Sequence, residues 1–581
     1  MTEMLRWPAR SIEETHAILT APGSTYEMDT AVIRGVETRV WKNAPPNLRT
    51  LLELGRVWGD REFVVYQDER MTFEQHHRAV VKLANALWND YGVRKGDRVV
   101  IAMRNYPEWI LSWAAVTAIG AVAVPLNSWG TGEELEYGVT DSESRVAIAD
   151  QERYDRLRPH LPRTPLKSVI LARGDEDVPN VDAFESVVAH PSRYDDLPAD
   201  AALPEVEVEP EDYAFIFYTS GTTGKPKGAL GTHRNVLTNL LSSFFTRARA
   251  FVRRGEEPPT IDPNAPQRAG LLSVPLFHAT GCFSVLVPSF ALGGKLVLMY
   301  RWDPEQALEL IERERINSFG GVPAMVWQVL ESPNFGKYDL SSVENVGYGG
   351  APAAPELVAR IKEAFPEIES NNGYGLTETS AITTMNFAED YAAKPDSVGV
   401  PVPVCDVKIV DAEGNALPQG EVGEIWIKGP NVVAGYWRKP EATAQSFTDG
   451  WLHSGDLGRM DEEGFLYILD RAKDMLIRGG ENIYCVQVED VLYSHPAVMD
   501  AAVVGIPHKV LGEEVGAIVQ VKPGHDVTES ELQAHVAQHL AAFKVPVTIE
   551  IRREPLPRNA NGKILKRDLR EEFLEHIGRK D

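Results

Sequence analysis

Cysteine is scarce in this sequence, and positive charge is in deficit. The 581 residues contain three widely separated cysteines with no C-x-x-C motif: Cys282, Cys405 and Cys485. An odd number at such spacing excludes a disulfide framework and a cysteine zinc site, and it is typical of the reducing cytoplasm. The net charge of −25 disfavours nucleic acid and anionic membranes as partners, because both need a basic surface.

Membrane-spanning helices are not expected either. Residues 109–126 are uncharged over a length that could cross a bilayer, but Gly120 and Pro125 divide them into a buried helix and a buried strand. Residues 269–294 also lack charge, and repeated Pro and Gly would break a spanning helix. The N-terminus has no apolar signal core and the C-terminal Arg-Lys-Asp is no peroxisomal address, so we expect a cytoplasmic protein.

The chain is too long for one hydrophobic core, and its apolar pattern divides it. Short apolar strands alternate with amphipathic helices over residues 62–150 and again over 213–385. This alternation predicts parallel β-α-β units with ligand sites at the C-terminal ends of the strands. Residues 398–468 read as a β-rich subdomain, and a compact unit follows residue 474. The expected fold is α/β: a large N-terminal domain of two β-α-β subdomains plus a β-rich subdomain, and a small α+β C-terminal domain.

Individual elements can be placed from the same pattern. The predicted strands are residues 63–66, 98–103, 121–125, 145–149, 407–410, 423–428, 501–506, 515–521 and 547–552. The predicted helices are residues 72–90, 108–119, 133–139 and 529–540.

A loop rich in glycine, hydroxyl groups and lysine follows the strand-like residues 213–218. Residues 218–228 read Y-T-S-G-T-T-G-K-P-K-G. Glycine lets backbone N–H groups approach an anion, hydroxyls donate further hydrogen bonds and lysine adds positive charge, so the loop suits phosphate. Its spacing is neither the Walker pattern nor G-x-G-x-x-G.

This loop resembles the phosphate-binding signature of the adenylate-forming superfamily, which includes acyl-CoA synthetases, nonribosomal-peptide adenylation domains and beetle luciferases. Further motifs follow in the order typical of that superfamily, and the resemblance extends from about residue 47 to 570. These motifs are N-G-Y-G-L-T-E at 372–378, W-L-H-S-G-D-L-G at 451–458, D-R-A-K-D at 470–474 and P-R-N-A-N-G-K-I-L-K-R-D-L-R at 557–570.

The resemblance implies an N-terminal AMP-binding domain at 1–470, a mobile C-terminal domain at 474–581 and a hinge at 470–473. It also implies ATP and Mg²⁺ as cofactors, with Thr222 and Glu378 as metal-site residues. In the motif at 372–378, Tyr374 should stack on adenine and Thr377 should contact the α-phosphate, while Asp456 should accept from the ribose hydroxyls. The implied nucleotide residues are Thr219, Ser220, Gly221, Thr222, Thr223, Lys227, Gly350, Ala351, Asn372, Gly373, Tyr374, Thr377, Asp456, Arg471 and Asn482. The superfamily usually has glutamine at the position of Asn372.

Two half-reactions are implied, each with its own arrangement of groups. Lys563 should stabilise the adenylation transition state, and rotation about Lys473 should replace it with the R-G-G-E-N face at 478–482. Arg478, Gly479 and Gly480 of that face should contact coenzyme A. His278, in P-L-F-H-A-T-G, resembles the aromatic gate that covers the acyl tunnel; a buried core histidine is the alternative.

The resemblance implies a carboxylic acid:CoA ligase that forms acyl-AMP and then acyl-CoA. Residues 269–294 contain no acid that could pair with an amino acid's ammonium, which favours a fatty or aryl-alkyl acid. The alternatives are an acyl-AMP ligase that loads a carrier protein, a luciferase-like oxygenase and a non-catalytic acyl-binding protein. Residues 248–268 are expected to form a solvated surface loop; alternatively, Arg249, Arg253 and Arg254 capture the phosphates of coenzyme A.

Overall fold

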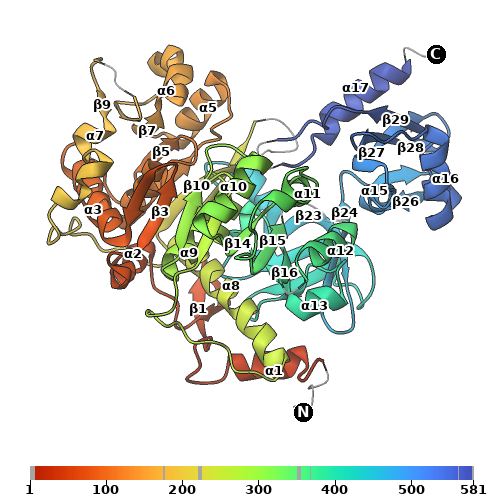
Figure 1. The fold of residues 1–581 in the computed structure, drawn as a ribbon, viewed down its shortest axis with the longest axis horizontal. Helices are drawn as coiled ribbons and strands as arrows, with labels where there is room; N and C mark the ends of the chain where they lie inside the picture. Colours follow the sequence, from red (N-terminus) through yellow and green to blue (C-terminus); the bar gives the residue numbers. More distant parts are fainter. Residues whose placement is uncertain are drawn as a thin grey trace.

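The computed structural model describes residues 7–174, 177–219, 225–349, 355–366, 368–559 and 562–578. Its architecture is the α/β fold expected from the sequence, with two large sheets in the N-terminal part. Figure 1 shows these sheets side by side, with the C-terminal residues as a separate body in blue.

The first large sheet carries the phosphate-loop strand. Strands β10, β6, β5, β7, β8 and β9 run parallel, because helical crossovers connect most of them, and β11 returns antiparallel to β10. In spatial order the strands are β21 (Gly435–Tyr436), β11 (Lys227–Thr232), β10 (Tyr213–Thr219), β6 (Val122–Pro125), β5 (Arg98–Ala102), β7 (Val146–Asp150), β8 (Ser168–Ala172) and β9 (Val181–Ala183).

The second large sheet has nine strands and carries the N-G-Y-G segment on β16. In spatial order they are β18 (Val400–Pro401), β17 (Thr384–Phe387), β16 (Glu369–Tyr374), β15 (Asn345–Gly349), β14 (Ser318–Gly321), β12 (Ala269–Leu272), β13 (Lys295–Leu298), β3 (Glu62–Tyr66) and β4 (Glu69–Thr72).

Helices separate and cover these sheets in layers. A continuous hydrophobic core between the sheets includes α3 (Phe73–Asn89), α4 (Pro107–Ala118), α8 (His233–Arg253) and α9 (Val287–Ala291). The outer face of the first sheet packs against α5 (Gly132–Ser142) and α6 (Gln151–Leu157). The outer face of the second sheet packs against α10 (Pro304–Glu314), α11 (Pro323–Leu330) and α12 (Pro355–Ala364).

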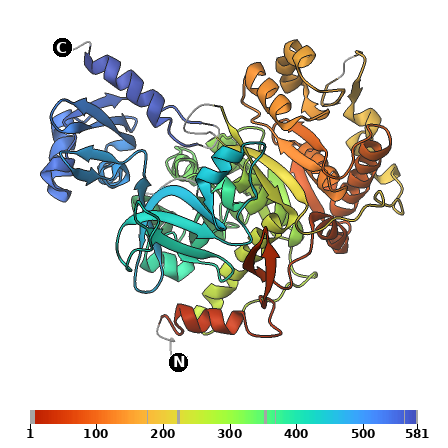
Figure 2. The ribbon, with the colours of Figure 1, turned by 180° about the vertical axis from the view of Figure 1, so that it is seen from behind.

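A smaller β-rich part follows the second sheet, as the sequence predicted. Its strands are β19 (Asp406–Val410), β20 (Gly423–Lys428), β22 (Phe447–Thr448), β23 (Trp451–Met460) and β24 (Leu466–Arg471). Strand β24 leads into the C-terminal unit, whose strands are β25 (Leu476–Arg478), β26 (Glu481–Ile483), β27 (Val498–His508), β28 (Gly512–Val521) and β29 (Thr548–Arg552). Its helices are α15 (Cys485–Tyr493), α16 (Glu529–His539) and α17 (Lys566–Gly578), and Figure 2 shows the unit from behind.

The uncharged runs fold as buried elements. Residues 109–126 contain most of α4 and all of β6, and residues 269–294 contain β12, the π-helix η4 (Thr280–Leu286) and α9. Among the described residues no helix is both long enough and apolar enough to cross a bilayer. The three cysteines are buried and unpaired.

The prediction of a surface loop at 248–268 is wrong for its first part. Helix α8 continues to Arg253, and the side chains of Arg249 and Arg253 are 1% and 4% exposed. Arg249 donates to the carbonyl of Met385, and Arg253 donates to the carboxylate of Asp390. The alternative of coenzyme A capture is therefore wrong for Arg249 and Arg253, which are buried against protein partners. Arg254 is half-buried and pairs with Glu369 and Glu389. Residues 255–266 are mostly exposed, as the sequence predicted.

Candidate active site

Strands β10 and β11 form a hairpin that flanks the phosphate loop. Thr219 and Lys227 face each other in its register, and the Thr219 hydroxyl donates to the carbonyl of Lys227 at 3.3 Å. Ser220, Gly221, Thr222 and Thr223 lie outside the described residues. The Lys227 ammonium lies 4.8 Å from the ring centroid of Tyr436, and none of the ion pairs among the described residues involves Lys227.

Strand β16 brings the second motif alongside β15. Gly349 faces Gly373 in this parallel pair, and a Cβ atom on Gly349 would lie 3.0 Å from the carbonyl oxygen of Gly373. Gly350 and Ala351 lie outside the described residues. The side chain of Asn372 is buried, so it does not present a free surface amide. Thr377 and Glu378 follow on the 3₁₀ turn η6 (Thr377–Thr379).

Asp456 is the centre of a polar network on β23. It pairs with Arg471 of β24, whose Nε lies 2.9 Å from its Oδ1, and its Oδ2 accepts from the Tyr374 hydroxyl at 2.7 Å. Burial, and then the Asp456 charge, raise the pKa of Tyr374 well above its usual value, so the hydroxyl stays a donor. Each carboxylate oxygen keeps lone-pair capacity for a further donor such as a ribose hydroxyl.

Lys563 of the C-terminal unit lies among these N-terminal groups. The protein around Lys563 lowers its pKa through burial and then through Arg471, whereas Asp456 and Glu378 favour its charged form. Lys563 is nevertheless exposed to solvent in the present arrangement. Charged groups of the N-terminal part therefore act on this lysine of the C-terminal unit.

His278 is a further neighbour of Lys563. Burial and then the Lys563 charge lower its pKa to about 3, so the imidazole is neutral at ordinary pH. Its Nε2 is buried and has no hydrogen-bond partner among the described residues. A neutral ring beside the charged ammonium is compatible with the predicted gate.

The residues predicted to contact coenzyme A are not part of the polar network around Asp456. Gly479 and Gly480 form the turn between β25 and β26, with φ angles of 59° and 92°, and they are exposed together with Asn482. The Arg478 guanidinium pairs with Glu514 inside the C-terminal unit. Lys473 is exposed between the β-rich part and this unit, and its charge contributes to lowering the pKa of Lys563.

Tyr436 is a site residue that the sequence reasoning missed. Its hydroxyl donates to Oε1 of Glu378 at 2.8 Å, while its ring lies under the Lys227 ammonium. Pairing of β21 with β11 sets this position. Nothing in the spacing of a tyrosine 58 residues after Glu378 indicates the contact.

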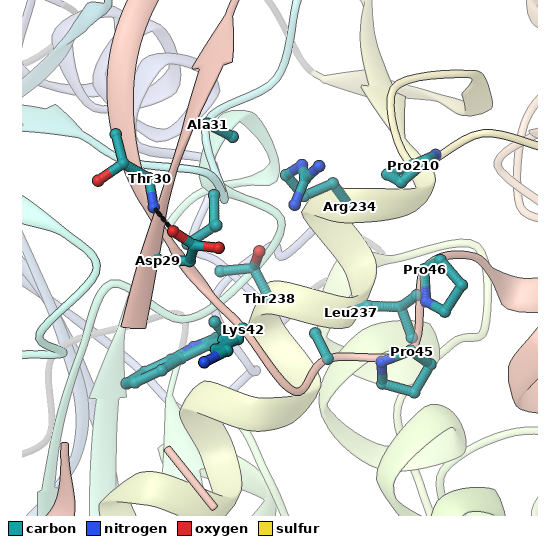
Figure 3. A pocket seen from close by; sticks show the side chains of 13 residues that line it. Asp29, Thr30, Ala31, Lys42, Pro45, Pro46, Pro210, Arg234, Leu237 and Thr238 are labelled. Atoms are coloured by element: carbon teal, nitrogen blue, oxygen red, sulfur yellow. Dashed lines mark hydrogen bonds between the residues drawn. The ribbon is translucent and has the colours of Figure 1, made fainter. Parts of the chain in front are cut away.

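A pocket of about 280 Å³ lies elsewhere, between α8 and the hairpin of β1 (Met28–Ile33) and β2 (Val36–Trp41) (Figure 3). Its charged side chains have protein partners: Lys42 pairs with Glu27, and Arg234 pairs with Glu211. None of the predicted site residues lines it.

A two-sheet α/β body with the N-G-Y-G segment on β16, followed by a small C-terminal unit, is the architecture expected of an adenylate-forming enzyme. Residues 53–437 match the AMP-binding enzyme family, and residues 487–563 match the AMP-binding enzyme C-terminal domain. The chain belongs to this family, and the resemblance to the adenylate-forming superfamily is confirmed.

Similar proteins act on different acids. A long-chain-fatty-acid–CoA ligase of Bacillus subtilis (strain 168) is 35% identical, covering 89% of this chain and 92% of that protein. A feruloyl-CoA synthase of an Amycolatopsis species is 36% identical, covering 87% and 94%. The solved structure of the amide bond synthetase McbA from Marinactinospora thermotolerans has a TM-score of 0.77 and 31% identity, covering 90% of this chain and 99% of that one.

Proposed function

We propose that this protein is an ATP- and Mg²⁺-dependent ligase that joins a hydrophobic carboxylic acid to coenzyme A. The observation that carries the proposal is that the Lys563-bearing segment lies against the N-terminal part. Gly562 packs on Val322, and the charges of Asp456, Arg471 and Glu378 act on the pKa of Lys563. The matching family and the ligases among the relatives support the same class of activity.

In the first step, a carboxylate oxygen attacks the α-phosphorus of ATP. A new oxygen–phosphorus bond forms, the bond from the α-phosphorus to the bridging oxygen breaks, and pyrophosphate leaves with the electron pair. Thr219 and Lys227, with residues 220–223, hold the phosphates, and Lys563 offsets the negative charge that develops at the α-phosphorus. Asp456 and Arg471 hold the ribose, and Asn372, Gly373 and Tyr374 form the adenine side with Gly350 and Ala351.

Magnesium fits the donors that are present. The described residues contain no group of three or more His, Cys, Asp or Glu side chains able to hold a metal ion alone. Mg²⁺ is commonly bound by one or two carboxylates together with phosphate oxygens, and Glu378 supplies one such carboxylate next to the phosphate loop. The Thr222 hydroxyl would be a second protein donor to the Mg²⁺ ion. When bound, the ion screens the charge of the triphosphate.

In the second step, the coenzyme A thiolate attacks the acyl carbon and AMP leaves as the carboxyl–phosphate bond is broken on the carbonyl side. We propose that residues 474–581 rotate about a hinge at 470–473, so that Lys563 withdraws from the 1–470 domain. Arg478, Gly479, Gly480 and Asn482 would then face the adenylate; of these, the two glycines and Asn482 are exposed in the present arrangement.

The acid itself is proposed to be a fatty or aryl-alkyl acid. The uncharged stretch around the neutral His278 offers no carboxylate to pair with an ammonium group, so an amino acid is disfavoured. The relatives named for long-chain fatty acids and for ferulate agree with an apolar or aromatic acid.

The test is release of AMP and pyrophosphate across a panel of fatty, aryl and amino acids, with coenzyme A, a carrier protein or an amine as acceptor. We expect AMP release with an apolar acid and coenzyme A, with the thioester confirmed by mass spectrometry. Turnover with an amine or carrier protein but not with coenzyme A would contradict the proposed acceptor. Oxygen uptake with the adenylate would identify an oxygenase.

A further inference from the structure

Lys563 is carried by a loop that closes on itself. Arg558 and Ile564 form an isolated antiparallel bridge, and the amide of Asn559 donates to the carbonyl of Lys563 at 2.8 Å. The Lys563 amide in turn donates to Oδ1 of Asn559 at 3.0 Å. The backbone of Lys563 is therefore held by hydrogen bonds on both its donor and its acceptor.

Gly562, directly before Lys563, is held in a special conformation. Its φ of 74° lies in the left-handed region that favours glycine, and a Cβ atom there would come within 2.6 Å of Val322. Val322 precedes α11 in the N-terminal part, so the loop tip packs tightly against the opposite domain. Small errors in the loop would displace the lysine, which must reach the nucleotide.

Arg558 connects this tip to the core of the C-terminal unit. One guanidinium nitrogen donates to the carbonyl oxygen of Gly562, and the other donates to Oδ2 of Asp500. Asp500 lies on β27, is 6% exposed, and also accepts from the Tyr493 hydroxyl and from the Ala501 amide. A guanidinium can make both bonds at once because its N–H groups form a rigid planar fork, whereas lysine has a single nitrogen.

We propose that Arg558 is a positioning residue for the first half-reaction: by joining the Gly562 carbonyl to Asp500, it sets the place of the Lys563 ammonium. The inference rests on the proposed function, since Lys563 is taken to act only in adenylation. The described contacts of the Arg558 side chain are with the Gly562 carbonyl and Asp500, both in the C-terminal unit. Its effect passes through Lys563, and misplacement of a reacting group by about 1 Å can cost on the order of 10²-fold in rate.

The experiment compares R558Q and R558K with the unmodified protein in two assays. Adenylation is followed by pyrophosphate release from acid and ATP, and thioester formation is followed from supplied acyl-AMP and coenzyme A. We expect R558Q to lower the adenylation kcat by about 10- to 100-fold with little change in the KM for ATP, and to leave thioester formation within about twofold. R558K should show a smaller loss of adenylation, because it retains charge beside Asp500 but cannot make both bonds.

A double-mutant cycle separates positioning from general damage. In the K563A background, R558Q should lower adenylation no further, because residues acting through one group are not additive. Arg553→Gln, which breaks only an exposed pair with Asp526, is the matched control and should leave both assays unchanged.

Three outcomes would overturn the inference. They are an unchanged adenylation rate in R558Q, equal loss of both half-reactions by folded R558K, and a further loss when R558Q is added to K563A. The proposed function is judged separately, by whether the unmodified protein makes acyl-AMP and acyl-CoA at all. A protein that makes neither rejects the proposed function before any variant is compared.

Discussion

The Tyr436 hydroxyl donates a hydrogen bond to Glu378 at 2.8 Å while the same ring lies 4.8 Å from the Lys227 ammonium. One side chain therefore contacts both the carboxylate proposed to hold Mg²⁺ and a lysine proposed to hold phosphate. The hydroxyl and the ring face can be removed separately, so the two contacts give different predictions.

Tyr436→Phe should weaken the response to Mg²⁺ more than the binding of metal-free ATP. Phenylalanine keeps the ring under Lys227 but removes the hydrogen bond that orients the Glu378 carboxylate. A hydrogen bond of this kind, to a charged group, contributes about 1.5–3 kcal/mol. We expect a several-fold rise in the Mg²⁺ concentration that gives half-maximal adenylation, and calorimetry should show weaker Mg²⁺-dependent ATP binding. Tyr436→Leu should in addition weaken ATP binding without Mg²⁺. A parent-like response to Mg²⁺ in Tyr436→Phe would reject the role of the hydroxyl, and equal effects of the two variants on ATP binding would reject a separate role of the ring.

Lys563→Ala should separate the two half-reactions. Loss of one preorganised cation at the α-phosphate should slow adenylation by on the order of 10²–10³-fold. Thioester formation from supplied acyl-AMP should stay near the parent rate, because the lysine is proposed to act only in the first step. Pyrophosphate release and thioester yield measure the two steps. Equal losses in both would reject the assignment of Lys563 to a single step.

Lys473→Pro should hold the C-terminal unit in one orientation, because proline fixes φ and restricts the preceding residue. The Asp456-bearing site already has Lys563 in place, so we expect adenylation to persist while transfer to coenzyme A falls sharply. Lys473→Ala is the matched control, because it removes the charge near Lys563 and leaves the backbone free. Parent rates in both steps of the proline variant would mean that the hinge lies elsewhere.

His76→Leu should reduce sensitivity to acid. His76 is 2% exposed, both its ring nitrogens lack partners among the described residues, and it borders a small apolar cavity with Leu51, Ile110 and Phe290. Burial and then His77 lower the pKa of His76 to about 3, below the value near 6.5 in an unfolded chain. Between these two pKa values the histidine is protonated in the unfolded state but neutral in the folded state. The contribution of neutral His76 to stability is therefore fully present above pH 6.5 and is lost as the pH falls toward 3.

Because of His76 alone, the free energy of unfolding should fall by about 1.4 kcal/mol for each pH unit below 6.5. Thermal midpoints of the parent and His76→Leu at pH 7.5 and 5 test the effect, and the variant should lose less on acidification. His525→Leu, at an exposed position, is the control and should behave as the parent does. An identical drop in His76→Leu and the parent would refute the role of this histidine.

The β-α-β alternation could be predicted because buried parallel strands and amphipathic helices have distinct apolar periods, as in α3 and β5. The residue at which α8 ends could not be predicted, because Arg253 is neutralised by Asp390, which lies 137 residues later in the sequence. Local sequence shows a charge but not its distant partner.

The motifs identified most candidate site residues, yet they could not show how these residues meet. That the Asp456 charge acts on Lys563 depends on the orientation of the whole C-terminal unit, which no sequence spacing encodes. The contact of Tyr436 with Glu378 likewise depends on the edge pairing of β21 with β11.

The first helix, α1 (Ile12–Leu19), and the residues before it pack on the end of α8, at the lower edge of the molecule in Figures 1 and 2. Arg253 donates to the carbonyl of Arg10 and lies 5.1 Å from the ring centroid of Trp7. One turn earlier, Arg249 donates to the carbonyl of Met385, which faces Gly373 of the N-G-Y-G segment. A shortened protein that starts with the shared family segment at residue 53 would uncover this side of α8 and loosen the support behind the nucleotide strand. We therefore expect the smallest working unit to extend on the N-terminal side beyond the residues that match the family model.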